Sequence, residues 1–248
     1  MDLNTDKTWE RYGEVDPYFG VITNSKYHSW VLTDHARDEF FRSGEAHVQG
    51  ILKILREIKP GFSPNRAIDF GCGVGRVTLP LARESASVLG VDVAAGMLSE
   101  AQKNAAERGF SNVRFASEVS GRFDLVHSFI VIQHIPPRRG LPIVRDLVSR
   151  VVPGGMIVLQ VPYYWNASVW HKLATRVTRV APITMRVLNL ARGRGFNYPT
   201  MNTFCYSVRS ILAIFHNAGI DNIRICLDTS AGARHASMTL YGQNGKAK

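Results

Sequence analysis

The sequence has few cysteines, no long apolar run and one long interval without acidic residues. Cysteine occurs three times in 248 residues, without metal-ligand spacing, at Cys72, Cys205 and Cys226. This favours reduced thiols over a disulfide framework or a metal site. No apolar run approaches the ~20 residues that cross a bilayer. The first residues, MDLNTDKTWERYGEVD, are polar and acidic, so neither a signal nor a transit peptide is predicted, and a cytoplasmic protein is expected.

Acidic residues are missing between Asp146 and Asp221, in a chain whose net charge is +10. A localised basic surface favours an anionic partner, and a solvated helix face is the equally weighted alternative. Residues 166–181 have the pattern of a basic amphipathic helix, which could lie on an anionic membrane surface, cover an acidic substrate or pack on the sheet. The basic residues of the interval are Arg150, Lys172, Arg176, Arg179, Arg186, Arg192, Arg194 and Arg209.

Strand and helix patterns alternate from residue 66 onward. This alternation predicts a Rossmann-like, doubly wound α/β sheet, mostly parallel with an antiparallel last strand. Residues 117–122 are too few for a crossover helix, and Pro153-Gly154-Gly155 predicts a turn before the fifth strand. The predicted strands are 66–71, 88–92, 112–116, 123–129, 156–162, 221–227 and 237–242. The predicted helices are 74–86, 94–108, 137–150 and 207–218.

Two segments stand apart from this alternation. Residues 1–62 are rich in aromatics and are predicted to form a helical segment, either a lid over a pocket or a structural cap on the core. The main domain is predicted to comprise residues 63–248. Within the cap, DPYFG predicts a turn at Pro17, and a helix from Thr33 or Asp34 is expected to be interrupted at Gly44. Residues 163–203 are predicted to be a basic helical insertion after the fifth strand.

The most informative stretch is RAIDFGCGVGRVTLPLA, residues 66–82, where a strand pattern changes to a helix pattern across three glycines. Gly71, Gly73 and Gly75 have no Cβ, so the backbone can turn tightly and approach a ligand. The free N–H groups that follow can hold an anion. Asp92 ends a second apolar run at the separation at which a carboxylate binds a ribose hydroxyl. An ordinary tight turn is the alternative.

A nicotinamide dinucleotide is the main rival ligand for this turn. Its fingerprint requires a third glycine three residues after the second, and Arg76 stands at that position. An arginine side chain would obstruct the close approach of helix and strand. The sequence also lacks an identifiable segment for the second half of a dinucleotide. It has no recognisable RNA-binding module, so nucleic acid is not expected as a partner.

Four segments in order, AIDFGCGVGRVTLPLA, VLGVDVAAGML, FDLVHSFIVIQHIP and VPGGMIV, together resemble the class I S-adenosylmethionine-dependent methyltransferases. The N-terminal DPYFGVITNSKY and FFRSGEAHV resemble a bacterial subgroup associated with sugar or glycan modification. The resemblance implies S-adenosylmethionine as the methyl donor and S-adenosylhomocysteine as the product, and no metal is predicted.

The resemblance also implies roles for matching positions. The turn would lie beneath the methionine end of the cofactor, Asp92 would bind both ribose hydroxyls, and Arg76 would pair with the carboxylate or lie on the helix surface. Val93 and Met97 would flank the adenine. Ser117 and Glu118 would lie at the adenine edge, where the family often has an aspartate. The implied cofactor-binding residues are Asp69, Gly71, Cys72, Gly73, Gly75, Arg76, Asp92, Val93, Met97, Ser117, Glu118, Phe129 and Ile130.

Methyl transfer from a sulfonium depends mainly on alignment, but a hydroxyl acceptor benefits from a base. His134 is the candidate catalytic base because it follows the fourth predicted strand, at the sheet edge where such folds bind ligands. A histidine bonded to the backbone at a helix start is the equally weighted alternative, and His28 and His35 are weaker candidates.

The predicted function is O-methylation of a sugar, a glycan or another small polar metabolite, including anionic or lipid-linked acceptors. N-methylation of a small molecule, RNA methylation and non-catalytic cofactor binding are kept as alternatives. The Asn/Asp-Pro-Pro-aromatic tetrapeptide of many amino-methylating enzymes is absent after Phe129. The expected location is the cytoplasm, with peripheral contact at the inner membrane surface through residues 166–181 as an option. The oligomeric state is left open.

Overall fold

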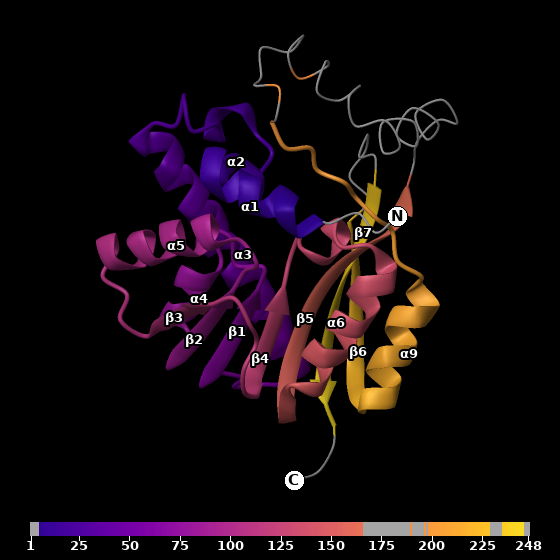
Figure 1. The fold of residues 1–248 in the computed structure, drawn as a ribbon. Helices are drawn as coiled ribbons and strands as arrows, with labels where there is room; N and C mark the ends of the chain where they lie inside the picture. Colours follow the sequence, from indigo (N-terminus) through magenta and orange to yellow (C-terminus); the bar gives the residue numbers. More distant parts are fainter. Residues whose placement is uncertain (1–4, 166–188, 190–195, 197, 229–234, 246–248) are drawn as a thin grey trace.

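The computed structural model describes residues 5–165, 189, 196, 198–228 and 235–245 (Figure 1). At its centre is a seven-stranded sheet with the order β3-β2-β1-β4-β5-β7-β6. Strands β1 to β5 pair in parallel, while β7 runs antiparallel to both neighbours, which confirms the predicted fold class. The strands are β1 Arg66–Phe70, β2 Ser87–Val91, β3 Val113–Ala116, β4 Phe123–Ser128, β5 Val151–Trp165, β6 Ile220–Asp228 and β7 His235–Asn244.

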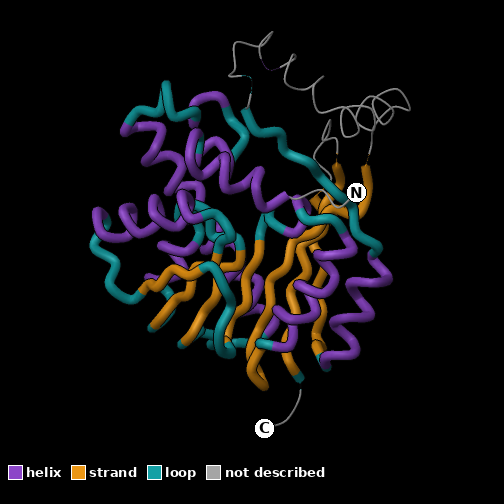
Figure 2. The backbone as a smooth tube through the Cα atoms, viewed as in Figure 1, coloured by secondary structure: helices purple, strands orange, loops and turns teal. Residues whose placement is uncertain are grey.

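Helices cover both faces of the sheet, and the N-terminal helices α1 and α2 lie beyond one end of its strands (Figures 1 and 2). The N-terminal helices are α1 Thr5–Val15, α2 Pro17–Val21, η1 Ser25–Tyr27 and α3 Asp34–Ile58. The others are α4 Thr78–Arg83, α5 Ala95–Glu107, η2 Ile132–His134, α6 Pro137–Ser149 and α9 Val208–Ala218.

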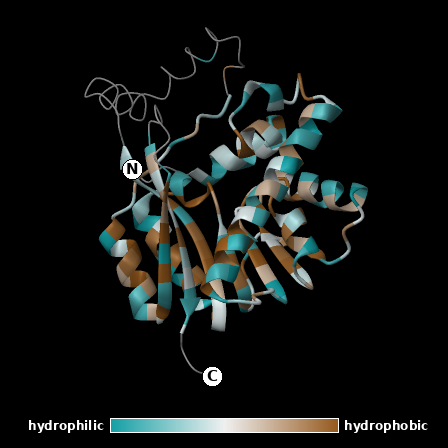
Figure 3. Cartoon of the chain, turned by 180° about the vertical axis from the view of Figure 1, so that it is seen from behind, coloured by the Kyte–Doolittle hydropathy of each residue, from teal (hydrophilic) through white to brown (hydrophobic). Residues whose placement is uncertain are grey.

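Both faces of the central strands are apolar, because successive residues of a strand point to opposite sides. Ile68, Val126 and Ile157 belong to the cluster that includes α6 and α9. Their neighbours Ala67 and Leu125 pack on the other face with α3 and α4. Figure 3 shows the largely hydrophobic strands between helices that carry hydrophilic residues as well. Burial on both faces is what holds a central parallel sheet in place.

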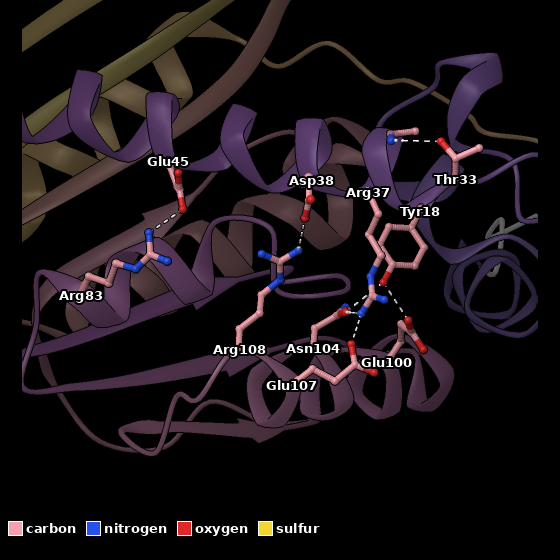
Figure 4. Close-up of polar contacts among 11 residues, drawn as sticks. Tyr18, Thr33, Arg37, Asp38, Glu45, Arg83, Glu100, Asn104, Glu107 and Arg108 are labelled. Carbon is pink, nitrogen blue, oxygen red and sulfur yellow. Dashed lines mark hydrogen bonds and ion pairs between the residues drawn. The ribbon is translucent and has the colours of Figure 1, made fainter.

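The N-terminal helices pack on α5, and most of their aromatic side chains join a third apolar cluster. Polar contacts reinforce this packing (Figure 4). Tyr18 Oη lies 2.7 Å from Glu100 Oε1 and 2.9 Å from Asn104 Oδ1. Arg37 donates to the same Asn104 oxygen at 2.7 Å and pairs with Glu107. The α5 helix is thus held from both α2 and α3.

Two local predictions in the N-terminal region are wrong. Pro17 begins the short helix α2 instead of a turn, because its fixed φ suits the first helical position. Gly44 does not interrupt α3, which continues to Ile58. The glycine is required for packing: an added Cβ would lie 2.0 Å from the carbonyl oxygen of Arg76.

Two boundaries near the sheet also differ from the prediction. Helix α4 begins at Thr78 instead of residue 74, because Gly75 has a left-handed φ of 89°. Strand β5 begins at Val151, and Pro153-Gly154-Gly155 is an irregularity within it, where the register with β4 shifts. Residues 117–122 form a loop without a helix, as expected.

The predicted basic helix at 166–181, with Lys172, Arg176 and Arg179, lies outside the described residues, as does most of the 163–203 insertion. In the described part of the chain, no helix is long and apolar enough to cross a bilayer. The division into a cap of residues 1–62 and a domain of residues 63–248 stays a prediction.

Replacing Gly44 with alanine is expected to destabilise the protein by about 1–3 kcal/mol, because the methyl group would force the Arg76 backbone to move. Gly50→Ala in the same helix is the matched control, since nothing lies within 4 Å of its added Cβ. Helix propensity should make that variant more stable by about 0.5–1 kcal/mol. Urea unfolding measures both changes, and equal stability of the two variants would contradict the packing role of Gly44.

Candidate active site

A cavity lies where the N-terminal helices meet the carboxyl ends of the parallel strands, the edge at which open α/β sheets bind ligands. Most of the predicted site residues line it: Gly71, Gly73, Arg76, Asp92, Val93, Met97, Ser117, Phe129, Ile130 and His134. The predicted residues that do not line it are Asp69, Cys72, Gly75 and Glu118.

Backbone hydrogen bonds join the glycine turn to the end of β2. The N–H groups of Gly71 and Cys72 both donate to the Val91 carbonyl, at 2.7 and 2.9 Å. A Cβ on Gly71 would lie 2.2 Å from the side chain of Val131, and one on Gly73 would lie 2.5 Å from Val21. Both glycines also have positive φ, at 78° and 52°. The turn therefore requires glycine both for its conformation and for its packing.

Asp92 follows β2 and points at the glycine turn. One carboxylate oxygen accepts the Gly73 N–H at 2.9 Å, and the other accepts the Ala94 N–H at 3.0 Å. Burial raises the pKa of this carboxyl above its ordinary value, and the two backbone donors oppose the rise. Each oxygen still has a lone pair, so the carboxylate can accept two further hydrogen bonds.

The residues predicted beside adenine divide into two groups. Val93 and Met97 line the cavity together and offer apolar surface, with Met97 fully buried. Ser117 follows β3 and also lines the cavity. Glu118 is exposed and does not line the cavity.

Arg76 is buried in the cavity wall and is not on a helix surface. Its side chain is 5% exposed, and Nη1 donates to Ser43 Oγ at 3.3 Å. Its Nε has no hydrogen-bond partner, and no ion pair to Arg76 occurs within the described residues. Burial lowers the pKa of the guanidinium, and a buried cation of this kind favours an anionic ligand.

Asp69 supports the turn from below. One carboxylate oxygen accepts from Thr78 Oγ1 at 2.6 Å, and the other lies 2.8 Å from His127 Nδ1. His127 Nε2 lies 3.1 Å from His47 Nε2, so the chain of contacts reaches α3. Burial raises the pKa of the Cys72 thiol beside it. No local sequence pattern indicated the two histidines, because α3 and β4 are distant in sequence.

The sequence left two interpretations of His134 open, a catalytic base at the ligand edge and a histidine bonded to the backbone. His134 lines the cavity and is also hydrogen-bonded to the backbone. The carbonyl of Asn202 lies 2.8 Å from Nδ1 and can only accept, so Nδ1 carries the proton. Nε2 accepts from the Gln133 amide at 3.0 Å. Burial lowers the pKa of His134 to about 4. The weaker candidates His28 and His35 do not line the cavity.

The loop after β4 forms one wall of the cavity. Ile130 has a φ of 63°, a left-handed conformation that is strained for a β-branched residue. Its N–H donates to Gln160 Oε1 at 3.1 Å, which stabilises this conformation. The Phe129 ring packs on His47 with 4.1 Å between centroids. Strained backbone of this kind concentrates at functional sites.

Residues of α1 and α6 that the sequence did not single out also line the cavity. They include Asp6 and Trp9 from α1 and Arg139 from α6. Arg139 Nη2 donates to both carboxylate oxygens of Asp6, at 3.1 and 2.8 Å. The Trp9 ring lies edge-on to His134, with 4.8 Å between centroids. The aromatic-rich N-terminal sequence was the one feature that indicated a cavity wall from this segment.

A family model described as a methyltransferase domain matches residues 67–155. This part of the chain is a methyltransferase domain. The matched part of this methyltransferase domain runs from β1 into β5, so it contains the glycine turn, Asp92 and the loop after β4. The match confirms the resemblance to methyltransferases that the four sequence segments indicated.

Curated relatives match parts of this chain. Trans-aconitate 2-methyltransferase of Methylobacterium nodulans is 32% identical over 166 residues, which are 66% of this chain and 63% of the relative. An uncharacterised RNA methyltransferase of Thermosynechococcus vestitus is 32% identical over 109 residues, 42% of this chain and 24% of the relative. The chain spans 24% to 38% of the length of the first relatives that it matches.

Solved structures share the fold of this chain. Magnesium protoporphyrin IX methyltransferase from Synechocystis PCC 6803 with bound S-adenosylmethionine has a TM-score of 0.60 at 18% identity, over 98% of both chains. The N-terminal domain of EvdMO1, crystallised in the presence of S-adenosylhomocysteine and D-fucose, has a TM-score of 0.52 at 21% identity, over 77% of this chain and 80% of that one. Among the described residues of this chain, no group of three or more His, Cys, Asp or Glu is placed to hold a metal ion.

The His134 imidazole is expected to protonate only near pH 4, because burial penalises its charged form. The unfolded chain protonates this histidine near pH 6.5. Between these values the unfolded state binds more protons, so stability falls as the pH drops through this window, by about 3 kcal/mol at most.

Urea unfolding between pH 7 and pH 4 measures this loss, with His134→Gln as the comparison. The variant should lose less stability than the wild type on acidification. The same pH dependence in both proteins would contradict a buried, neutral His134.

Proposed function

We propose that the protein transfers the methyl group of S-adenosylmethionine to an oxygen of a small-molecule acceptor. The observation that carries this proposal is that two residues face one cavity at the glycine turn: Asp92 and the buried Arg76, which has no ion pair among the described residues. S-adenosylmethionine has a ribose diol, an adenine and an amino-acid carboxylate. Each of these groups would have a partner among the residues that line the cavity or support its wall.

The ribose and the adenine would bind around the end of β2. Asp92 would accept hydrogen bonds from the two ribose hydroxyls, one on each carboxylate oxygen. Adenine would lie against Val93 and Met97, with Ser117 near its edge. Glu118 is given no role, because it is exposed and lies off the cavity.

The methionine end would lie over the glycine turn. Gly71 and Gly73 line the cavity there, and Arg76 would pair with the carboxylate as a charge-assisted hydrogen-bond donor. Asp69, Cys72 and Gly75 would act from behind by holding the turn in shape. Phe129 and Ile130 would face the methyl-donor region.

S-adenosylmethionine, when bound, supplies an already activated methyl group, so the protein has to align the acceptor oxygen with the sulfur–methyl bond. His134 Nε2 is the proposed acceptor of the hydroxyl proton, once the Gln133 amide moves away from it. A pKa of about 4 makes this imidazole a weak base. Alignment would therefore provide most of the rate enhancement.

The proposed acceptor is a sugar, a glycan or another small polar metabolite. Support comes from the sequence resemblance to glycan-modifying proteins and from the structural neighbour crystallised with D-fucose. The segment 166–181 stays a predicted contact for an anionic acceptor or for the inner membrane surface. The cytoplasmic location likewise stays a prediction.

Titration calorimetry with S-adenosylhomocysteine and with adenosine separates the two polar contacts. Asp92→Ala is expected to weaken both ligands about 10- to 100-fold, since both contain the ribose diol. Arg76→Gln is expected to weaken S-adenosylhomocysteine by a similar factor and to leave adenosine unchanged, since adenosine has no carboxylate.

Arg83→Gln is the matched control for Arg76, because Arg83 is an exposed arginine of α4 that pairs with Glu45. It should change neither affinity. If the wild-type protein binds no S-adenosylhomocysteine, the proposed function is wrong. If Arg76→Gln weakens both ligands equally, Arg76 does not bind the carboxylate.

A further inference from the structure

An ion pair between Asp6 of α1 and Arg139 of α6 joins these two helices at the cavity wall. Neither residue is assigned to the methyl donor. Arg139 donates two hydrogen bonds to Asp6, and both residues line the cavity. Neither side chain is buried: 39% of Arg139 and 35% of Asp6 are exposed. Solvent-exposed pairs contribute little to stability, so a purely structural role is a weak explanation for a pair that faces a ligand cavity.

The position of Arg139 is electrostatically unusual. Arg138 and Arg139 lie in the first turn of α6, and that turn contains no acidic residue. The N-terminal end of a helix carries partial positive charge, so cations there are unfavourable unless an anion lies nearby. Asp6 provides such an anion, and it comes from an element 133 residues away in sequence.

Asp6 can leave this pair at low cost. It stands in the first turn of α1, where the helix dipole favours a carboxylate. Because about a third of its side chain is exposed, water can replace the guanidinium as its partner. A second carboxylate entering the cavity would then restore the same bidentate contact to Arg139, which suits the planar guanidinium.

We propose that Arg139 binds a carboxylate of the acceptor and that Asp6 holds the same position until the acceptor enters. The proposal rests on the proposed function and narrows its acceptor to a ring compound that bears a carboxylate. The ring is inferred from Trp9, Phe129 and Val131, whose apolar side chains line the same cavity. Either an aromatic acid or a sugar acid offers this shared chemistry.

Other charged groups of the cavity leave this role to Arg139. Arg76 is assigned to the donor carboxylate, and His134 is neutral at pH 7 because its pKa is about 4. Asp92 is itself a carboxylate and is assigned to the ribose. Among the described residues that line the cavity, Arg139 is therefore the cation available to an acceptor.

The test is calorimetry on the full-length protein saturated with S-adenosylhomocysteine. Two pairs of probes differ by the carboxylate: salicylate against salicylamide for an aromatic acid, and D-glucuronate against D-glucose for a sugar acid. At least one acid is expected to bind about tenfold tighter than its neutral partner. Arg139→Gln should abolish that preference, and Asp6→Asn should strengthen binding of the acid by removing its competitor.

Arg138→Gln is the control, because this neighbouring arginine does not line the cavity and should leave the preference intact. Unchanged affinity for S-adenosylhomocysteine shows that each variant is folded. No preference for either acid, a preference that survives Arg139→Gln, or weaker acid binding in Asp6→Asn overturns the inference. Failure of the wild type to bind S-adenosylhomocysteine would instead count against the proposed function.

Discussion

The hydrogen bonds between the glycine turn and the end of β2 are the constraint on which the site depends. The Val91 carbonyl accepts two N–H groups of the turn, and the Asp92 carboxylate accepts a third from Gly73. Since β1 and β2 are parallel neighbours, these bonds hold the two strand ends in one arrangement. A carboxylate and a side-chain-free stretch of backbone thereby face the same cavity.

The site and the N-terminal helices depend on each other through close packing. Gly44 of α3 packs directly on the carbonyl of Arg76, so the helix fixes the backbone that carries this buried guanidinium. Asp69, below the turn, reaches the same helix through His127 and His47. The N-terminal segment therefore does more than cover the cavity, because it sets the position of residues at the glycine turn and supplies Asp6 to the opposite wall.

The fold and the glycine-turn side of the cavity were predictable from local patterns. Apolar runs marked the strands, and the glycine turn with Asp92 marked the ligand edge. The opposite wall was not predictable, because the pairing of Arg139 with Asp6 joins residues that no local pattern connects. Gly44 was misread for the same reason: locally it weakens a helix, and its contact with a distant carbonyl becomes visible only in three dimensions.

A structure of the protein with S-adenosylhomocysteine bound tests the central claim most directly, since it locates the ligand relative to the turn. The account predicts both ribose hydroxyls within about 3.2 Å of the Asp92 carboxylate oxygens. It also predicts the ligand carboxylate at the Arg76 guanidinium. A ribose that does not contact Asp92, or a ligand bound away from the glycine turn, would contradict it.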